Sequence, residues 1–321
     1  MAELAVVRRG GFVESRHTGH VVALNRDGAN AVVLGSVDEV ILPRSTLKPL
    51  QALACLRAGA PLVGEEIAIA AGSHTGEDRH VDVVRRVLSR AGLGESDLGS
   101  PVDLPEHEPT RQAVLARGGG PDRLRMNCSG KHAAMLLACA TQGWDTAGYL
   151  DPGHPLQLLV REVVEEMTGE PVRHVTVDGC GAPLFGVTVR GLAASFRTLV
   201  LADKDTEASA VSSAMRAHPF FVGGTPHPNS DAMRMVPGLL AKGGAEGVIA
   251  MAAPTGEAVA IKVADGNPRA TTLVALAALR AVGVDISGAT PLMDQPVFGG
   301  GVRVGEIDLG ADVLGLPGRA A

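Results

Sequence analysis

The chain has 321 residues, of which 45% are hydrophobic, and its mean hydropathy is +0.18. A chain of this length and composition buries a large core, which excludes disordered proteins and small disulfide-stapled peptides. The formal net charge is −6 and no basic tail is present, so neither nucleic acid nor an anionic membrane surface is an expected partner, and a small neutral or zwitterionic molecule is favoured.

The first 45 residues predict antiparallel strands. Runs rich in β-branched residues alternate with turn signals at Gly10-Gly11 and Asp27-Gly28; the runs are LAVV, GHVVALN, NAVVLG and VIL. The opening segment MAELAVVRRGGFVE has an acidic residue at position 3 and arginines at positions 8 and 9, which leave no continuous apolar stretch for a signal peptide. We therefore expect a cytoplasmic protein.

The middle of the chain predicts helices. In PLQLLVREVVEEMTG the apolar residues form one stripe that stops at Gly169. Further helices are expected at VDVVRRVLSRAGL, GKHAAMLLACATQ, TEASAVSSAMRA and ATTLVALAALRA. The segment GVIAMAAPTGEAVAIKVADG predicts a hairpin that turns at Thr255-Gly256. The most apolar stretch, residues 270–282, contains Arg280 and is shorter than the ~20 residues of a membrane span.

Strands at both ends of the sequence enclose this helical middle. The simplest packing is a single compact unit over residues 1–321, with a sheet from about 1–45 and 184–321 and helices over about 46–183.

Cysteine and lysine usage carries two further clues. The four cysteines are spread through a chain large enough to fold without disulfide bonds. Buried thiols or a pair of metal ligands are therefore expected rather than disulfides. Only five of the 29 basic residues are lysines. A lysine amine can lose its proton near neutral pH, whereas a guanidinium cannot. Four of the five lysines lie in clusters with Ser, Cys or Gly, and only Lys204 reads as a plain surface charge.

The first such cluster is PRSTLK at residues 43–48, where the strand pattern changes to a helical one. On a helix, Ser45 and Lys48 at i, i+3 spacing have Cβ atoms about 5 to 6 Å apart. A desolvated neutral lysine can take the serine proton and so create a nucleophile. By itself this spacing more often marks a helix-capping serine followed by an ordinary lysine.

The second cluster is AGSHTGED at residues 71–78. Ser73 could pair with Lys262, which is the one charge in the apolar run AVAIKVAD and needs a partner, a sheet edge or a cavity. The alternatives are a capping loop at residues 75–77 and a Lys262 that extends its amine into solvent.

The third cluster joins NCSGKH at residues 127–132 with DGCGAP at residues 178–183. Neither segment completes a phosphate-binding loop or a dinucleotide fingerprint. Cys128 and Cys180 both lie in glycine-rich turns beside a titratable residue. They could hold zinc, form a redox pair, or be small buried thiols.

In this order, the clusters resemble those of the bacterial L-asparaginases of the Rhizobium etli thermolabile type. The resemblance extends from about Val6 to Val282, and its segments are RSTLKPLQAL, SHTGEDRHV, NCSGKHAAML, HPLQ, DGCGAPLFGV and AVAIKVADGNPRA. It implies an α/β (α+β) fold similar to that of serine β-lactamases and glutaminases, with an antiparallel sheet flanked by helices and a mostly helical subdomain. The segment GGTPHPNSDAM, residues 223–233, has proline and histidine where a smaller polar turn would be expected.

The resemblance also implies site residues. Ser45 would be the nucleophile with Lys48 as its base, and Ser73 with Lys262 would form a second Ser-Lys tandem. The implied substrate-binding residues are Arg44, His74 and Asp178. The implied zinc ligands are Cys128, Lys131 and Cys180. The family is often dimeric, so a homodimer is expected.

The expected function is therefore that of an L-asparaginase, which hydrolyses the side-chain amide of L-asparagine to L-aspartate and ammonia through an acyl-enzyme. A glutaminase or another Ser-Lys amidohydrolase is an alternative, because one methylene changes discrimination by only about 1 to 3 kcal/mol. A zinc-dependent binding or redox protein, in which the serines merely cap helices, is an alternative from a different class.

Overall fold

The computed structural model describes residues 1–316, which group into two compact units. The sheet unit comprises residues 1–46, 187–201 and the described residues from Asp231 onward; the helical unit comprises residues 47–186 and 202–230. The expectation that the whole chain forms a single compact unit stays a prediction.

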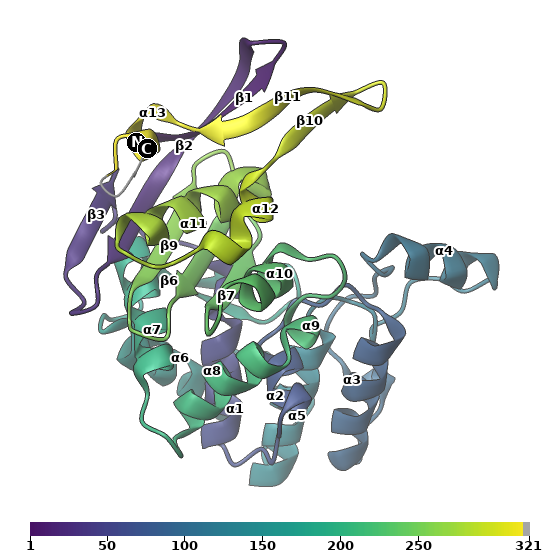
Figure 1. Cartoon of the computed structure of the whole chain (residues 1–321). Helices are drawn as coiled ribbons and strands as arrows, with labels where there is room; N and C mark the ends of the chain where they lie inside the picture. The colour runs from purple at the N-terminus through teal and green to yellow at the C-terminus, as the bar shows by residue number, and fades with distance from the viewer. Residues whose placement is uncertain (317–321) are drawn as a thin grey trace. The chain divides into compact units, whose positions relative to one another are not determined.

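An eight-stranded antiparallel sheet forms the centre of the sheet unit, in the order β10-β11-β1-β2-β9-β8-β7, with β3 paired to β2 (Figure 1). Its strands are β1 (Ala2–Arg9), β2 (Phe12–Leu24), β3 (Asn30–Leu34), β7 (Leu240–Gly244), β8 (Val248–Ala252), β9 (Ala258–Val263), β10 (Pro296–Gly299) and β11 (Val302–Leu309). The short β4 (Val40–Ile41) pairs instead with the last residues of β6 (Pro183–Thr188).

Strands from the two ends of the chain lie side by side in this sheet. Strand β1 pairs with β2 on one side and with β11 on the other, so that Val7 lies opposite both Ser15 and Ile307. The predicted hairpin is confirmed: β8 and β9 pair up to Ala252 and Ala258, and Gly256 in the turn has a φ of +103°, a conformation that favours glycine.

Both faces of the central strands are covered. Every residue of β8 is buried, although successive side chains of a strand point to opposite faces. Helices α7 (Val189–Leu201) and α11 (Thr271–Ala281) both contact β8 and β9. Two further helices, α12 (Thr290–Met293) and α13 (Ala311–Leu314), complete the unit, and α10 (Pro228–Met235) begins in the helical unit and ends in this one.

Packed helices make up most of the helical unit. They are α1 (Lys48–Arg57), α2 (Glu65–Ala70), α3 (Asp78–Arg90), α4 (Glu108–Ala116), α5 (Ser129–Gln142), α6 (Pro155–Thr168), α8 (Glu207–Ala217) and α9 (Pro219–Val222). Helix α1 contacts α5, α6 and α8, and α3 contacts α5. A short strand, β5 (His174–Val177), forms a hairpin with the first residues of β6.

The helix signals in the sequence are confirmed. Helix α6 begins at Pro155, after His154 accepts a hydrogen bond from the Leu156 N–H, and it ends at Gly169, whose φ is +71°. Its buried apolar residues all belong to the predicted stripe: Leu156, Val160, Val163, Val164 and Met167. The antiparallel sheet flanked by helices and the mostly helical second unit confirm the expected fold class. Within residues 1–316, no helix has the length and apolarity to cross a membrane.

Candidate active site

Lys48 is the first residue of α1, and only 1% of its surface is exposed. Its Nζ makes three hydrogen bonds. The acceptors are the carbonyl oxygens of Gly72, at 2.6 Å, and Asn127, at 3.2 Å, and the third partner is the Ser73 hydroxyl, at 2.9 Å. These contacts hold the amine in one place within the helical unit, directly beside a serine.

The three partners of Lys48 define what its amine can do. Carbonyl oxygens only accept hydrogen bonds, whereas a hydroxyl can donate or accept. A charged ammonium would donate to all three partners. A neutral amine would donate to Gly72 and Asn127 and would accept the Ser73 proton with its lone pair. The arrangement therefore satisfies both protonation states and provides a direct path for a proton between Ser73 and Lys48.

The loop that carries Ser73 is fixed by His74, which is fully buried. Ring atom Nδ1 accepts from the Gly76 N–H, and Nε2 contacts the Ser129 hydroxyl at 2.8 Å. Burial holds the pKa of His74 well below its usual value, so the ring is neutral at pH 7. Neither ring nitrogen is left for a substrate, so any contribution of His74 to substrate binding is indirect, through the position of this loop.

The segment that departs from the family pattern runs alongside the Ser73 loop. Ser73 N–H donates to the Val222 carbonyl at 2.8 Å, and Thr75 N–H donates to Gly223, also at 2.8 Å. Gly224 has a φ of +141°, and a Cβ there would lie 1.9 Å from the Thr75 hydroxyl. The tight approach of the two segments therefore requires glycine at this position.

Ser45 lies in the sheet unit, in a 3₁₀ turn (Arg44–Leu47) that leads into α1. The preceding Arg44 has a φ of +54°, an uncommon conformation for a residue with a side chain. Its guanidinium lies 3.9 Å from the Glu246 carboxylate. Strand β7 approaches the same turn, because a Cβ on Gly244 would lie 3.1 Å from the Ser45 nitrogen.

Lys262 lies on β9, where it pairs with His20 of β2 and Val248 of β8. Its amine donates to the Glu246 carbonyl oxygen. Burial lowers the pKa of Lys262, while the Glu246 carboxylate acts against this shift. Within the sheet unit, this lysine therefore has a backbone partner and an acidic neighbour.

Lys242, which no motif in the sequence indicates as a site residue, is fully buried on β7. Its amine donates to the Gly243 carbonyl at 2.6 Å. Residues two apart on a strand share a face, so Lys242 projects from the same face as Gly244, which meets the Ser45 turn. The chain has only five lysines, and four of them lie in clusters with Ser, Cys or Gly. This pattern was the one feature of the sequence that could have indicated Lys242.

The structure thus brings Lys48 and Ser73 together. Ser45 and Lys262 belong to the sheet unit, whereas Lys48 and Ser73 belong to the helical unit. The two tandems implied by the resemblance, Ser45 with Lys48 and Ser73 with Lys262, each have one member in each unit. Both pairings stay predictions.

The expected zinc ligands converge within the helical unit. Cys128 immediately precedes α5, Lys131 lies in its first turn, and Cys180 lies in the loop between β5 and β6. All three side chains are buried, and the Lys131 amine lies 3.0 Å from the Cys180 sulfur. Cys128 and Cys180 pack in one cluster with Met126.

Charges are tightly coupled within this cluster. A hydrogen bond from Cys180, with the nearby amines of Lys48 and Lys131, holds the pKa of the Cys128 thiol well below its usual value. Burial alone would lower the pKa of Lys131, but the two sulfurs raise it. Cys128 is therefore a neighbour of Lys48 as well as of Cys180. Asp178, on the same loop as Cys180, also favours the charged form of Lys131.

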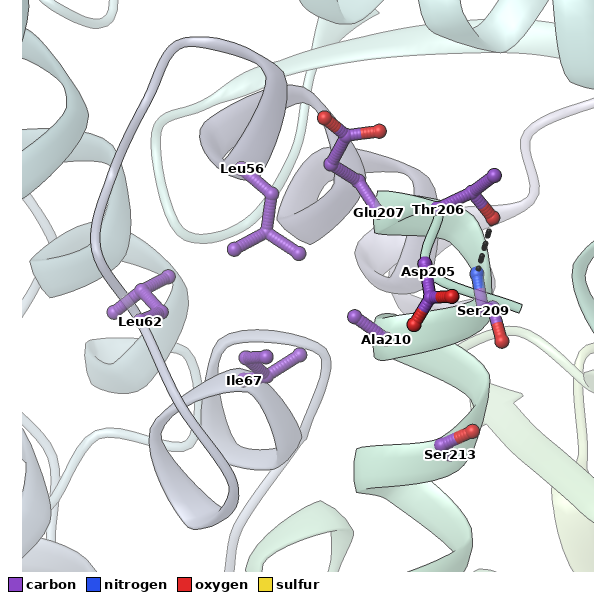
Figure 2. Close-up of a pocket in the computed structure, with 9 residues that line it drawn as sticks. All are labelled: Leu56, Leu62, Ile67, Asp205, Thr206, Glu207, Ser209, Ala210 and Ser213. Atoms are coloured by element: carbon purple, nitrogen blue, oxygen red, sulfur yellow. Dashed lines mark hydrogen bonds between the residues drawn. The ribbon is translucent and has the colours of Figure 1, made fainter. Parts of the chain in front are cut away.

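A separate pocket of about 400 Å³ opens in the helical unit (Figure 2). Figure 2 shows Leu56, Leu62 and Ile67 facing the first turns of α8, where the Thr206 hydroxyl accepts a hydrogen bond from the Ser209 N–H. None of the site residues expected from the sequence lines this pocket.

Solved structures similar to this chain include a β-lactamase from Mycobacterium bovis, with 16% identity over 82% of this chain and 93% of that one and a TM-score of 0.45. EstCE1, a hydrolase with promiscuous acyltransferase activity, has 13% identity over 86% and 91% of the two chains and a TM-score of 0.42. Simvastatin synthase from Aspergillus terreus has 12% identity over 85% and 94% and a TM-score of 0.38.

No curated protein matches the sequence significantly. The sequence profile of the L-asparaginase II family, however, matches residues 5–309, nearly the whole chain. The chain therefore belongs to the L-asparaginase II family and is a hydrolase that acts on amides.

Proposed function

We propose that the protein is an L-asparaginase that hydrolyses the side-chain amide of L-asparagine through an acyl-enzyme formed on Ser45. Lys48 serves as the base. The Lys48 amine can pass a proton to the Ser73 hydroxyl, or take one from it. The observation that carries this proposal is the buried Lys48 amine, held 2.9 Å from Ser73 by two carbonyl acceptors in a chain of this family.

The chemistry follows from the needs of amide hydrolysis. The Ser45 oxygen attacks the amide carbon while neutral Lys48 takes the hydroxyl proton. Backbone N–H groups at the start of α1 stabilise the oxyanion, each by about 3 to 4 kcal/mol. The leaving amine then takes a proton and departs as ammonia, and water hydrolyses the aspartyl ester. Positioned proton transfer contributes roughly 10² to 10⁴ in rate.

The proposal includes a second amine, for which two residues are candidates. The resemblance assigns Lys262 as the partner of Ser73. The burial of Lys242, and its place on the strand face that meets the Ser45 turn, favour Lys242 instead. The two assignments can be distinguished by substitution, because only the residue that supplies the second amine should be required for activity.

A zwitterionic amino acid needs one cationic and one anionic partner, and the resemblance supplies Arg44, which precedes Ser45, and Asp178, which acts on Lys131. We assign the substrate carboxylate to Arg44, because a guanidinium fork matches carboxylate geometry. Asp178 is assigned to the substrate ammonium group. Asn and Gln differ by one methylene, so the same residues would also accept glutamine at reduced efficiency.

Ammonia release from L-asparagine and L-glutamine by the purified protein tests the proposal. Asparagine should be the better substrate by roughly 10- to 200-fold, as one methylene allows. Ser45→Ala should abolish ammonia release while leaving the melting temperature within a few degrees of the wild type. Equal or faster glutamine hydrolysis would instead make the protein a glutaminase, and an active Ser45→Ala variant would remove the nucleophile assignment.

Zinc is the metal that we propose for the Cys128, Lys131 and Cys180 cluster. Two soft thiolate sulfurs and an amine nitrogen form a donor set that suits zinc, although Lys131 would have to release its proton to bind. Among residues 1–316 no group of three His, Cys, Asp or Glu side chains could hold a metal, so the amine is an essential third donor. Zinc would hold this part of the site together and help to position substrate.

Metal analysis of the same sample tests the zinc proposal. The wild type should bind about one zinc per chain, and Lys131→Met should bind at least tenfold more weakly. An unchanged affinity in this variant would exclude the amine as a ligand. A homodimer and a cytoplasmic location remain predictions.

A further inference from the structure

Cys128 and Cys180 are the two thiols of this chain that lie in loops and touch each other. They pack in the same buried cluster with Met126 and Ala182, and 4% and 2% of their respective surfaces are exposed. They are 52 residues apart in the sequence (180 − 128), yet each lies directly beside a hydrogen-bonded turn. The two thiols are joined by a side-chain hydrogen bond.

The loop around Cys180 can adjust. Cys180 lies between Gly179 and Gly181, and Gly181 has a φ of +89°. A Cβ on Gly181 would have no neighbour closer than 3.7 Å, so no close packing restricts the loop at this residue. A disulfide requires a sulfur–sulfur bond of about 2.05 Å and Cα atoms about 4.4 to 6.8 Å apart. A glycine-flanked loop can absorb the movement that brings two hydrogen-bonded thiols to this bond length more easily than a helix can.

The other two cysteines form a matched contrast. Cys55 lies within α1 and Cys139 within α5, two helices that are in contact, and Cys139 is among the groups that influence Cys55. Both thiols are fully buried, and burial raises the pKa of Cys139 to about 11. Their backbones are held by helical hydrogen bonds on both sides, so neither can move alone toward the other.

We propose that Cys128 and Cys180 form a reversible disulfide when the metal-free protein meets hydrogen peroxide. The Cys128 sulfur attacks one peroxide oxygen, the O–O bond breaks, and the thiol proton leaves with the other oxygen as water. The Cys180 sulfur then attacks the resulting sulfenic acid, and the hydroxyl leaves with the Cys180 proton as a second water. Two thiols are oxidised by two electrons, and one peroxide is reduced to two waters.

This disulfide has a structural consequence for its neighbours. Lys131 loses the Cys180 thiol as its hydrogen-bond partner, and the Cys128 sulfur can no longer carry the negative charge that the Lys48 amine favours. Both sulfurs also stop being available to a metal. The cluster is thus a modification site that couples an oxidant to the surroundings of Lys48.

Thiol mapping tests the proposal without an activity assay, so its outcome is separable from that of the proposed function. Protein dialysed against EDTA is treated with a few equivalents of hydrogen peroxide, unfolded, alkylated and digested. The number of free thiols should fall from four to two. Mass spectrometry should find one peptide pair joined through Cys128 and Cys180, and dithiothreitol should restore all four thiols.

Two variants sharpen the test. Cys139→Ser should still form the cross-link, so that its three thiols fall to one, whereas Cys180→Ser should form none. If Cys180→Ser does not fold, the wild-type peptide map decides alone. Four thiols remaining after treatment, a cross-link through Cys55 or Cys139, or irreversible oxidation of Cys128 alone would each overturn the proposal.

Discussion

Both Lys48 and Lys262 are expected from the sequence to lie beside a serine, but the structure gives the two lysines different surroundings. Lys48 starts a helix, is 1% exposed, and has its amine fixed by Gly72, Asn127 and Ser73. Lys262 lies near the end of β9, and its amine donates to the backbone carbonyl of Glu246, whose carboxylate favours the charged form of the lysine. An amine that exchanges a proton with a serine needs a hydroxyl partner, and Lys48 has one in Ser73 within the helical unit.

The largest expected effect comes from Lys48. Lys48→Arg keeps the charge but removes the ability to accept a proton near neutral pH, so kcat for ammonia release should fall by roughly 10² to 10⁴. The matched control is Lys204→Arg on an exposed turn, which should leave kcat unchanged. A Lys48→Arg variant that folds normally and keeps more than a tenth of the wild-type activity would remove the lysine base from the mechanism.

A smaller but more discriminating effect separates Lys242 from Lys262. Lys242→Arg should lower kcat at least tenfold, because this buried amine shares the strand face that meets the Ser45 turn. Lys262→Arg should cost less than threefold, because an arginine can still donate to the Glu246 carbonyl. Steady-state kinetics and melting temperatures of both variants check this. The reverse order would restore the assignment of Lys262 that the resemblance implies.

The smallest effect concerns the stability of the Ser73 loop rather than its chemistry. His80 stacks on His74 and on Phe220, and burial lowers the pKa of His80 to about 4. Its pKa in the unfolded chain is about 6.5, so between these values the unfolded chain binds a proton that the folded protein excludes. The contribution of His80 to the free energy of unfolding should therefore fall by about 2 kcal/mol from pH 7 to pH 5.

Urea unfolding at the two pH values measures this change. Substitution His80→Gln should flatten the pH dependence by about 2 kcal/mol, leaving the part that comes from His74. If wild type and variant lose stability in parallel between pH 7 and 5, His80 is not buried as a neutral ring.

The sequence predicted most elements of the fold for identifiable reasons. The stripe in residues 155–169 and its terminal glycine predicted α6, and the Thr255-Gly256 turn predicted the β8–β9 hairpin. The pairing of β1 with β11 joins residues about 300 positions apart, so no local pattern could specify it. The division into two units depends on contacts among several segments of the chain and was not visible in the sequence either.

The candidate site was predictable in its residue types but not in its contacts. Spacing favoured Ser45 as the neighbour of Lys48, and the structure shows Ser73 there, 25 residues away in the sequence. The resemblance implied His74 as a substrate-binding residue, and the structure shows both of its ring nitrogens in hydrogen bonds within the protein, which no sequence motif could specify. Lys242 has no motif around it, so only the scarcity of lysines in the chain could have pointed to it.

The most direct test of the account asks which serine becomes acylated. The reaction with L-asparagine is quenched with acid within its first turnovers, and the digested protein is mapped by mass spectrometry for an aspartyl ester. We predict that the ester forms on Ser45 in the wild type and is absent from Ser45→Ala. An ester on Ser73, or normal turnover with no ester on either serine, would contradict it.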